Sequence, residues 1–168
     1  MTHTRLLVAA IAVLGFATAA TAAPPQKDVQ SEQTILLDTI RANRKAFVAV
    51  NLQLDEAQAK DFWPLYDKYV GELNPIQDRV VKLVEDYTAD YKTLADDKAL
   101  HLIQDYLSAE ADRVQVRRTY LPEFAKILPG RTVARFYQLE NKMDAVLRYE
   151  LAGSIPVIDE KAAPPAKK

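Results

Sequence analysis

The residues from Asp55 to about Lys92 show the most regular hydrophobic pattern in the chain. Within them, apolar or aromatic side chains recur at alternating steps of four and three residues: Phe62, Tyr66, Tyr69, Leu73, Ile76, Val80, Leu83 and Tyr87. Such spacing indicates a helix that packs one face along a partner helix, as in coiled coils. At 1.5 Å per residue, this helix is roughly 57 Å long. We therefore predict that it organises the rest of the fold.

Two prolines lie inside this predicted helix. Pro64 and Pro75 each lack the N–H that would bond to the carbonyl four residues earlier, so each removes one hydrogen bond from the helix. The apolar pattern nevertheless continues past both positions. We therefore predict a helix that bends at the prolines and does not end there.

A shorter helix is predicted before the long one. Ser31 is a suitable N-cap, and the helical pattern continues to about Val50. Four apolar side chains share its predicted inward face: Leu36, Ile40, Phe47 and Val50. Beside this face lie three basic residues, Arg41, Arg44 and Lys45. We interpret them as a solvated flank, with a subsite for acidic partners as the alternative.

Two more helices are predicted after the long one. The third follows a turn at 93–96, is capped by Asp96 or Asp97, and runs to about Leu128. Its predicted inward face includes two charged residues: Leu100, Ile103, Leu107, Glu110, Val114, Arg117, Leu121, Phe124 and Leu128. The fourth helix follows Pro129-Gly130 and runs from Arg131 to about Ala152. Its predicted inward residues are Val133, Phe136, Glu140, Met143 and Leu147.

Together these elements predict an all-α fold. Short turns make neighbouring helices antiparallel, so we expect four antiparallel helices around a long central helical hairpin, kinked at the prolines. The outer helices are shorter than the two central ones. The first is expected to cover only residues 55–74 of the second helix, and the fourth only residues 107–128 of the third. The far end of the hairpin is then left uncovered.

The uncovered end of the hairpin is the predicted binding surface. Burying a Leu- or Val-sized side chain contributes about 1.5–3 kcal/mol, so leaving several exposed is unfavourable. We predict that a second copy of the chain or a bound polypeptide covers them, and that the chain forms a homodimer built on this hairpin. The predicted partner-binding residues are Val80, Leu83, Val84, Tyr87, Tyr91, Leu100, Ile103, Tyr106 and Leu107.

Residues 1–22 have the pattern of a secretory signal peptide. Arg5 provides a positive charge, residues 6–17 are apolar, and small residues precede a cleavage point near Ala22. The apolar stretch is shorter than the ~20 residues of a membrane span, so no stable membrane anchor is expected. The signal predicts export, with the bacterial periplasm as the expected location.

The remaining chain is predicted to form one domain. A flexible leader at residues 23–30 precedes a helical domain at 31–155, and residues 156–168 are predicted as a disordered tail. The chain has no Cys, so helix packing and not a disulfide framework must hold the exported domain together. Its formal net charge of −1 lacks the basic excess that nucleic-acid phosphates require, so no nucleic-acid partner is expected.

Few residues could carry out catalysis. The chain has two His, and only His101 follows the signal peptide. A nucleophilic triad needs a Ser or Cys near a His, and a helical metal site needs paired His or Glu-x-x-His; no such pattern is found. Glu85, Asp86 and Asp90 are candidates for loose cation binding, with a solvated face as the simpler interpretation. His101 and Met143 are separated by roughly 22 Å along the predicted helices, too far for joint haem ligation. No cofactor and no enzymatic activity are expected.

A short motif opens the long helix. Leu54-Asp55-Glu56-Ala57-Gln58 resembles the Leu-Thr-x-x-Gln motif of the Spy/CpxP family of small exported helical proteins. That family carries two such motifs, and Leu128 stands where the second would begin. Asp55 replaces Thr and preserves capping, whereas the second position lacks both Thr and Gln. The motif-like residues are Leu54, Asp55, Gln58 and Leu128.

The resemblance implies a periplasmic, cradle-shaped helical dimer. It also implies activity as an ATP-independent chaperone or as an adaptor in envelope-stress signalling. Two functions are therefore open at the level of sequence. One is the non-enzymatic holding of non-native polypeptide on the apolar tip, and the other is a structural adaptor that presents the same surface to one envelope protein.

Overall fold

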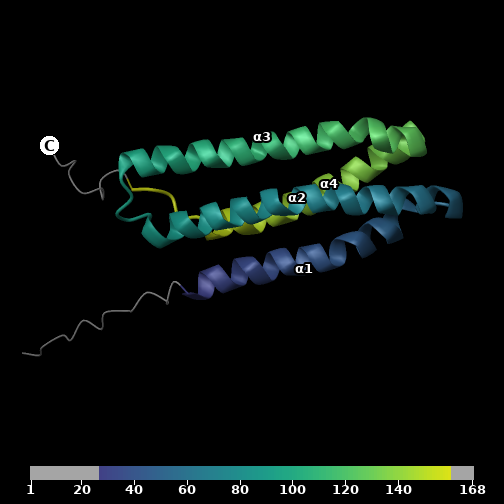
Figure 1. Cartoon of the computed structure of the whole chain (residues 1–168). Helices are drawn as coiled ribbons and strands as arrows, with labels where there is room; N and C mark the ends of the chain where they lie inside the picture. Colours follow the sequence, from purple (N-terminus) through teal and green to yellow (C-terminus); the bar gives the residue numbers. More distant parts are fainter. Residues whose placement is uncertain (1–26, 160–168) are drawn as a thin grey trace, which may run out of the picture.

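The structure is a computed structural model that describes residues 27–159. Within this range the chain contains helices and no strand, which confirms the predicted all-α class. The helices are α1 (Lys27–Leu52), α2 (Glu56–Asp90), α3 (Asp96–Ile127) and α4 (Gly130–Ser154) (Figure 1). The predicted signal peptide and the residues from 160 onward lie outside the described part of the chain.

A capping box sets the start of α2. The Asp55 carboxylate accepts a hydrogen bond from the backbone N–H of Gln58 at 2.8 Å, and the Gln58 side-chain oxygen accepts one from the N–H of Asp55 at 3.3 Å. These bonds satisfy N–H groups that a helix start otherwise leaves unpaired. From there α2 continues through Pro64 and Pro75 to Asp90, as the uninterrupted apolar pattern predicted.

The two long helices lie side by side (Figure 1). The Tyr120 hydroxyl of α3 donates to the Glu72 carboxylate of α2 at 2.6 Å, and Lys98 pairs with Asp90 at 2.6 Å near the turn. Residue numbers therefore rise along one helix as they fall along the other. Figure 1 shows α1 and α3 on opposite sides of α2 and α4, and α1 packs mainly on α4. We call the end with the α2–α3 turn the tip, and the opposite end the base.

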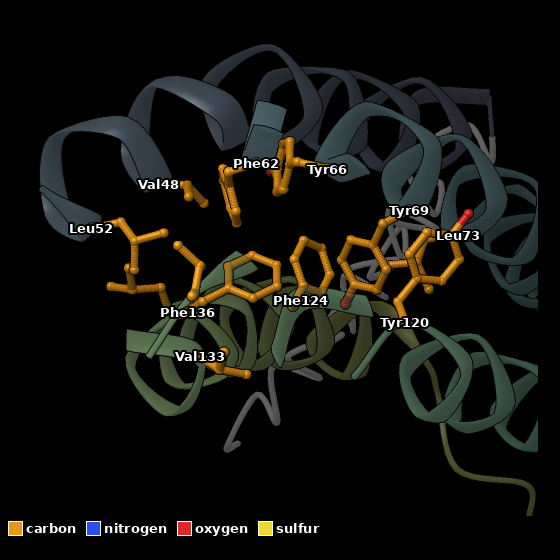
Figure 2. Packing of buried hydrophobic residues seen from close by; sticks show 12 residues of the cluster. Val48, Leu52, Phe62, Tyr66, Tyr69, Leu73, Tyr120, Phe124, Val133 and Phe136 are labelled. Atoms are coloured by element: carbon orange, nitrogen blue, oxygen red, sulfur yellow. The ribbon is translucent and has the colours of Figure 1, made fainter. Parts of the chain in front are cut away.

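The main hydrophobic core lies toward the base, and aromatic rings fill it (Figure 2). The ring centroids of Phe124 and Phe136 are 4.6 Å apart, and Phe62 meets Phe136 edge-on at 5.3 Å. Such ring pairs contribute about 0.5–1.5 kcal/mol beyond the area they bury. All four helices contribute to this core: Val48, Leu52, Phe62, Tyr66, Tyr69, Leu73, Tyr120, Phe124, Leu128, Val133, Phe136 and Leu139.

A second and smaller hydrophobic cluster lies nearer the tip. Its buried members are Leu37, Val81, Leu147 and Leu151. The presence of Leu37 beside Val81 corrects the prediction that α1 covers α2 only as far as residue 74. Arg41 of α1 likewise reaches past that point, since it pairs with Asp78 of α2 at 2.8 Å.

Charged side chains lie between the two clusters, and we call them the ionic layer. Arg44 is only 2% exposed and Glu140 is fully buried, with the Arg44 Nε donating to Glu140 at 3.3 Å. Asp144 lies 3.8 Å from Arg44 and accepts from Arg113 at 2.8 Å. Burial raises the pKa of Glu140, and the charge of Arg44 opposes that rise. The interpretation of Arg44 as part of a solvated flank was wrong, because its guanidinium pairs with a carboxylate inside the bundle.

On α2 the predicted inward residues are buried near the base, and toward the tip the neighbouring residues are buried instead. On α3 most of the predicted inward residues are exposed. After Leu73, α2 buries Gln77, Val81 and Val84 instead of the predicted Ile76, Val80 and Leu83. On α3 the predicted Phe124 is buried, but five predicted inward residues are exposed: Leu100, Ile103, Leu107, Val114 and Leu121. A straight helix has 3.6 residues per turn, so a face that repeats every 3.5 residues drifts by about 20° per heptad. The drift is removed where a step of four replaces a step of three, as in the consecutive steps from Leu73 to Gln77 and from Gln77 to Val81.

The predicted inward face of α1 holds at Ile40, which packs on the smaller cluster, and was wrong at Phe47 and Val50. Phe47 is 38% exposed and Val50 is 75% exposed, whereas Val48 and Leu52 are buried. The ion pair between Arg44 and the α4 carboxylate turns this neighbouring face inward. The inward residues predicted for α4 are buried or half-buried, as expected.

Candidate functional site at the tip of the helical hairpin

A groove of about 590 Å³ lies at the tip. Its walls are apolar or aromatic. It lies where α2 and α3 continue beyond the last turn of α4, and in the described part of the chain no other helix packs between them there. The lining residues come from α2, from α3 and from the chain that follows α4: Leu83, Val84, Tyr87, Leu102, Ile103, Tyr106, Ile155, Pro156, Val157 and Ile158.

The residues Ile155–Ile158, here called the C-terminal segment, occupy one side of this groove. They follow the end of α4 at Ser154 without regular secondary structure, and Ile155 has an extended backbone with φ −92° and ψ 108°. The Tyr87 hydroxyl donates a hydrogen bond to the carbonyl oxygen of Pro156 at 2.5 Å. Figure 1 shows this segment, at the yellow end of the described chain, leaving α4 and crossing toward the start of α3.

The position of this segment differs from the disordered tail predicted for residues 156–168. Three of its four side chains are aliphatic, and the groove offers them an apolar surface. The contact is loose, because Ile155 is 39% exposed, Ile158 is 43% exposed and Val157 is 91% exposed. Pro156 is the half-buried member of the segment.

The predicted binding residues at the end of α2 are buried or half-buried, and three of them line the groove. Val84 is buried, and Leu83 and Tyr87 are half-buried in the groove wall. Tyr91 is half-buried, with its ring centroid 6.2 Å from that of Tyr87. Val80 packs against the smaller hydrophobic cluster and does not line the groove. These side chains are therefore more covered than predicted.

The α3 residues of the set are the exposed ones. Leu100 is 65% exposed, and Ile103 and Leu107 are each 59% exposed, while Tyr106 is half-buried in the groove. Val114 and Leu121, at 41% and 47% exposure, continue the same helix face toward the base. We call these residues the exposed stripe: Leu100, Ile103, Leu107, Val114 and Leu121. Ile103 belongs to both the stripe and the groove, so the two surfaces are continuous.

The charges around the tip pair locally at the surface. Asp86 binds Lys82 at 2.8 Å, and His101 lies 3.1 Å from Asp105. Exposed pairs of this kind contribute little to stability. Burial, with a smaller contribution from Tyr91, raises the pKa of Tyr87, so its hydroxyl stays protonated and able to donate near neutral pH. Between residues 27 and 159, no group of three or more His, Asp or Glu is placed to hold a metal ion.

The motif-like residues have structural roles in this fold. Asp55 and Gln58 form the capping box of α2. Leu128 is buried in the main core, and Leu54 packs against that core. These four residues lie at the base, far along the bundle from the groove, so the motif accounts for how α2 starts and not for what the tip binds.

Sequence reasoning missed Leu102 and the C-terminal segment as parts of the groove. The segment did carry a usable signal. Pro156 is flanked by Ile155 on one side and by Val157 and Ile158 on the other, which is unusual for a solvated tail. Leu102 gave no such signal, because the apolar pattern of α3 favoured Leu100 and Ile103 as inward residues.

Comparison with known proteins gives no assignment. No protein-family model matches this sequence, and neither a curated protein nor a solved structure matches it. Among the helices described in the structure, none is both long and apolar enough to cross a membrane.

Proposed function

We propose that this protein is a non-enzymatic binding protein that holds extended apolar stretches of non-native polypeptide in the tip groove and on the exposed stripe. The observation that carries the proposal is the C-terminal segment. It is an apolar stretch outside the helices that forms one wall of the groove and is joined to α2 by a hydrogen bond to its backbone. The face formed by α2 and α3 thus already contacts the kind of ligand that we assign to it.

The chemistry of that contact suits a binder of many sequences. The Tyr87 hydroxyl donates to a backbone carbonyl, a group present in every residue, so the hydrogen bond does not select a side chain. The aliphatic contacts are non-directional and scale with the area removed from water. The exposed stripe extends the apolar surface along α3 and adds contacts for a longer client. Such contacts need no nucleotide or cofactor.

The location of this activity is part of the proposal. The signal-peptide pattern of residues 1–22 supports export to the periplasm, and the resemblance of Leu54–Gln58 to the Spy/CpxP motif favours the same location. The clients would be non-native or envelope polypeptides.

An aggregation assay tests the proposal. A denatured client is diluted into buffer with or without a stoichiometric amount of the protein, and light scattering is followed. The test variant is Ile103→Ser with Leu107→Ser, which removes two side chains that are each 59% exposed at the tip. The control is Val146→Ser, because Val146 on α4 is similarly exposed at 55% and does not line the groove.

We expect the unmodified protein and Val146→Ser to slow aggregation and the double variant to lose most of this effect. All three should show the same helicity, because the substituted side chains are largely exposed. If the unmodified protein leaves the aggregation rate unchanged, polypeptide holding is wrong. Equal protection by all three proteins would place the client surface somewhere other than the tip.

A second candidate function is a structural adaptor or homodimer that uses the same stripe. The observation that favours it is the regular spacing of Leu100, Leu107, Val114 and Leu121, which recur every seven residues as one position of a heptad does. A regular stripe suits one helix of a defined partner, and a second copy of the chain supplies such a helix. Sedimentation velocity at tens of micromolar tests self-association. A dimer that Leu107→Ser dissociates supports this role, and a monomer at every concentration contradicts it.

A further inference from the structure

We propose that the C-terminal segment is an internal ligand of the face that α2 and α3 present to the tip groove, and that polypeptide binds this face by displacing the segment. The inference rests on the proposed function and specifies how the same site is regulated. It also specifies the preferred ligand, an extended aliphatic stretch interrupted by proline, because that is the chemistry of Ile155-Pro156-Val157-Ile158.

The segment is held close to the groove by the helix that precedes it. Leu151, in the last turns of α4, is 6% exposed and belongs to the smaller hydrophobic cluster. α4 is thereby fixed on α2, and the segment begins directly after Ser154. A ligand tethered by so short a connection has an effective concentration in the millimolar range, which favours occupancy even when each contact is weak.

The contacts of the segment are few enough to permit exchange. Only Pro156 is half-buried, and the aliphatic residues on either side of it are more than a third exposed. A hydrogen bond from the Tyr87 hydroxyl joins Pro156 to α2. A segment with little buried apolar surface opens at a low free-energy cost. One wall of the groove is therefore a segment of the chain that can move away.

Proline at the most covered position explains which ligands fit best. A residue other than proline would bring a backbone N–H into this apolar site, and a buried N–H without a partner is unfavourable. Proline has no N–H, so its carbonyl can bond to Tyr87 without leaving a donor unpaired. Clients with an aliphatic–proline–aliphatic sequence should therefore compete most effectively with the segment.

The test measures binding of a labelled peptide to full-length variants. The probe is a fluorescent peptide with the sequence of residues 153–160, Gly-Ser-Ile-Pro-Val-Ile-Asp-Glu, followed by fluorescence anisotropy. The test variant is Ile155→Ser with Ile158→Ser, which weakens the internal ligand and leaves all groove residues of α2 and α3 intact. The matched control is Val157→Ser, because Val157 is 91% exposed and has little contact to lose.

We expect the double variant to bind the peptide about fivefold more tightly than the unmodified protein, as follows if the segment occupies the groove in about four of five molecules. Val157→Ser should bind like the unmodified protein. A second peptide with alanine in place of proline should bind more weakly to every variant. Far-UV circular dichroism should be unchanged, because the segment lies outside the four helices.

The possible results separate this inference from the proposed function. Equal or weaker peptide binding by the double variant overturns the internal-ligand inference, while protection of a client from aggregation would still support polypeptide holding. If no variant binds the peptide and none slows aggregation, both are wrong. If the peptide binds but alanine replaces proline without loss, the ligand preference is wrong.

Discussion

The ionic layer gives the sharpest prediction about stability. In the variant Arg44→Met, the fully buried Glu140 loses the cation that contacts it, while Met fills a similar volume. Breaking a buried ion pair by removing one partner costs about 3–5 kcal/mol, because a charge is left without compensation. Glu140 can reduce this cost only by taking up a proton.

Proton uptake sets a limit to the destabilisation. Glu140 has an ordinary pKa of 4.5, which burial already raises. Protonating such a carboxyl near pH 7 costs about 2.5 pH units at 1.36 kcal/mol each, or about 3.4 kcal/mol. At about pH 5 the same step costs about 0.7 kcal/mol. Because the folded variant binds the proton more tightly than the unfolded chain, its stability must rise as the pH falls toward 4.5.

We therefore expect Arg44→Met to lose about 3 kcal/mol near pH 7 and about 1 kcal/mol near pH 5. The assay is urea unfolding followed by far-UV circular dichroism. With a slope of about 2 kcal/mol per molar urea, the midpoint should fall by about 1.5 M at pH 7. The double variant Arg44→Met, Glu140→Leu should regain the unmodified stability at both pH values, since no buried charge remains.

The control for this experiment is Lys82→Gln, which breaks the exposed Lys82–Asp86 pair and should leave the midpoint unchanged within error. A penalty for Arg44→Met that is the same at both pH values would refute the reasoning, because proton uptake by Glu140 would then not occur. A double variant as unstable as the single one would show that lost packing, and not the uncompensated charge, is responsible.

Two further predictions concern other charged groups. Burial works to raise the pKa of Glu110, but Arg148 and Arg113 outweigh it and hold that pKa below 4.5. The ionised Glu110 therefore contributes to stability above pH 4.5, and this contribution is lost as the pH falls through the pKa of the folded state. Glu110→Gln should therefore reduce stability at neutral pH and flatten the acid limb of a stability–pH curve; an unchanged acid limb would contradict this. Asp55→Ala removes the cap of α2 and should cost about 1 kcal/mol in urea unfolding, whereas Asp55→Ser, which keeps a capping oxygen, should recover most of it. Equal loss in both variants would show that capping is not the cause.

The elements of this fold could be predicted from local signals. Asp55 was expected to cap α2 and does so, and the structure adds the reciprocal bond from Gln58 three residues later. Pro129-Gly130 marked the last turn equally well, and α4 begins at Gly130. The phase of the buried faces could not be predicted in the same way. Whether Leu100 or Leu102 turns inward depends on the supercoil of the bundle, which alternating steps of three and four do not determine.

The groove could be predicted only in part. Tyr87, Ile103 and Tyr106 were expected at the tip, and all three line it. The contact between Tyr87 and Pro156 joins residues far apart in sequence, and its existence depends on the exact length of α4. The burial of Arg44 was missed for a related reason. A charged residue of a helix is expected at the surface unless its ion-pair partner on another helix is known.

The two hydrophobic clusters differ greatly in size, and the ionic layer separates them. The cluster at the base has twelve buried residues, whereas the cluster nearer the tip has four. The bundle should therefore open locally at the tip before it unfolds as a whole. Amide hydrogens near Val81 and Leu151 should exchange with deuterium early, and those near Phe62 and Phe136 only on global unfolding. The base of the bundle is therefore rigid and the tip is easily deformed, so the tip could adapt to client polypeptides of different shapes.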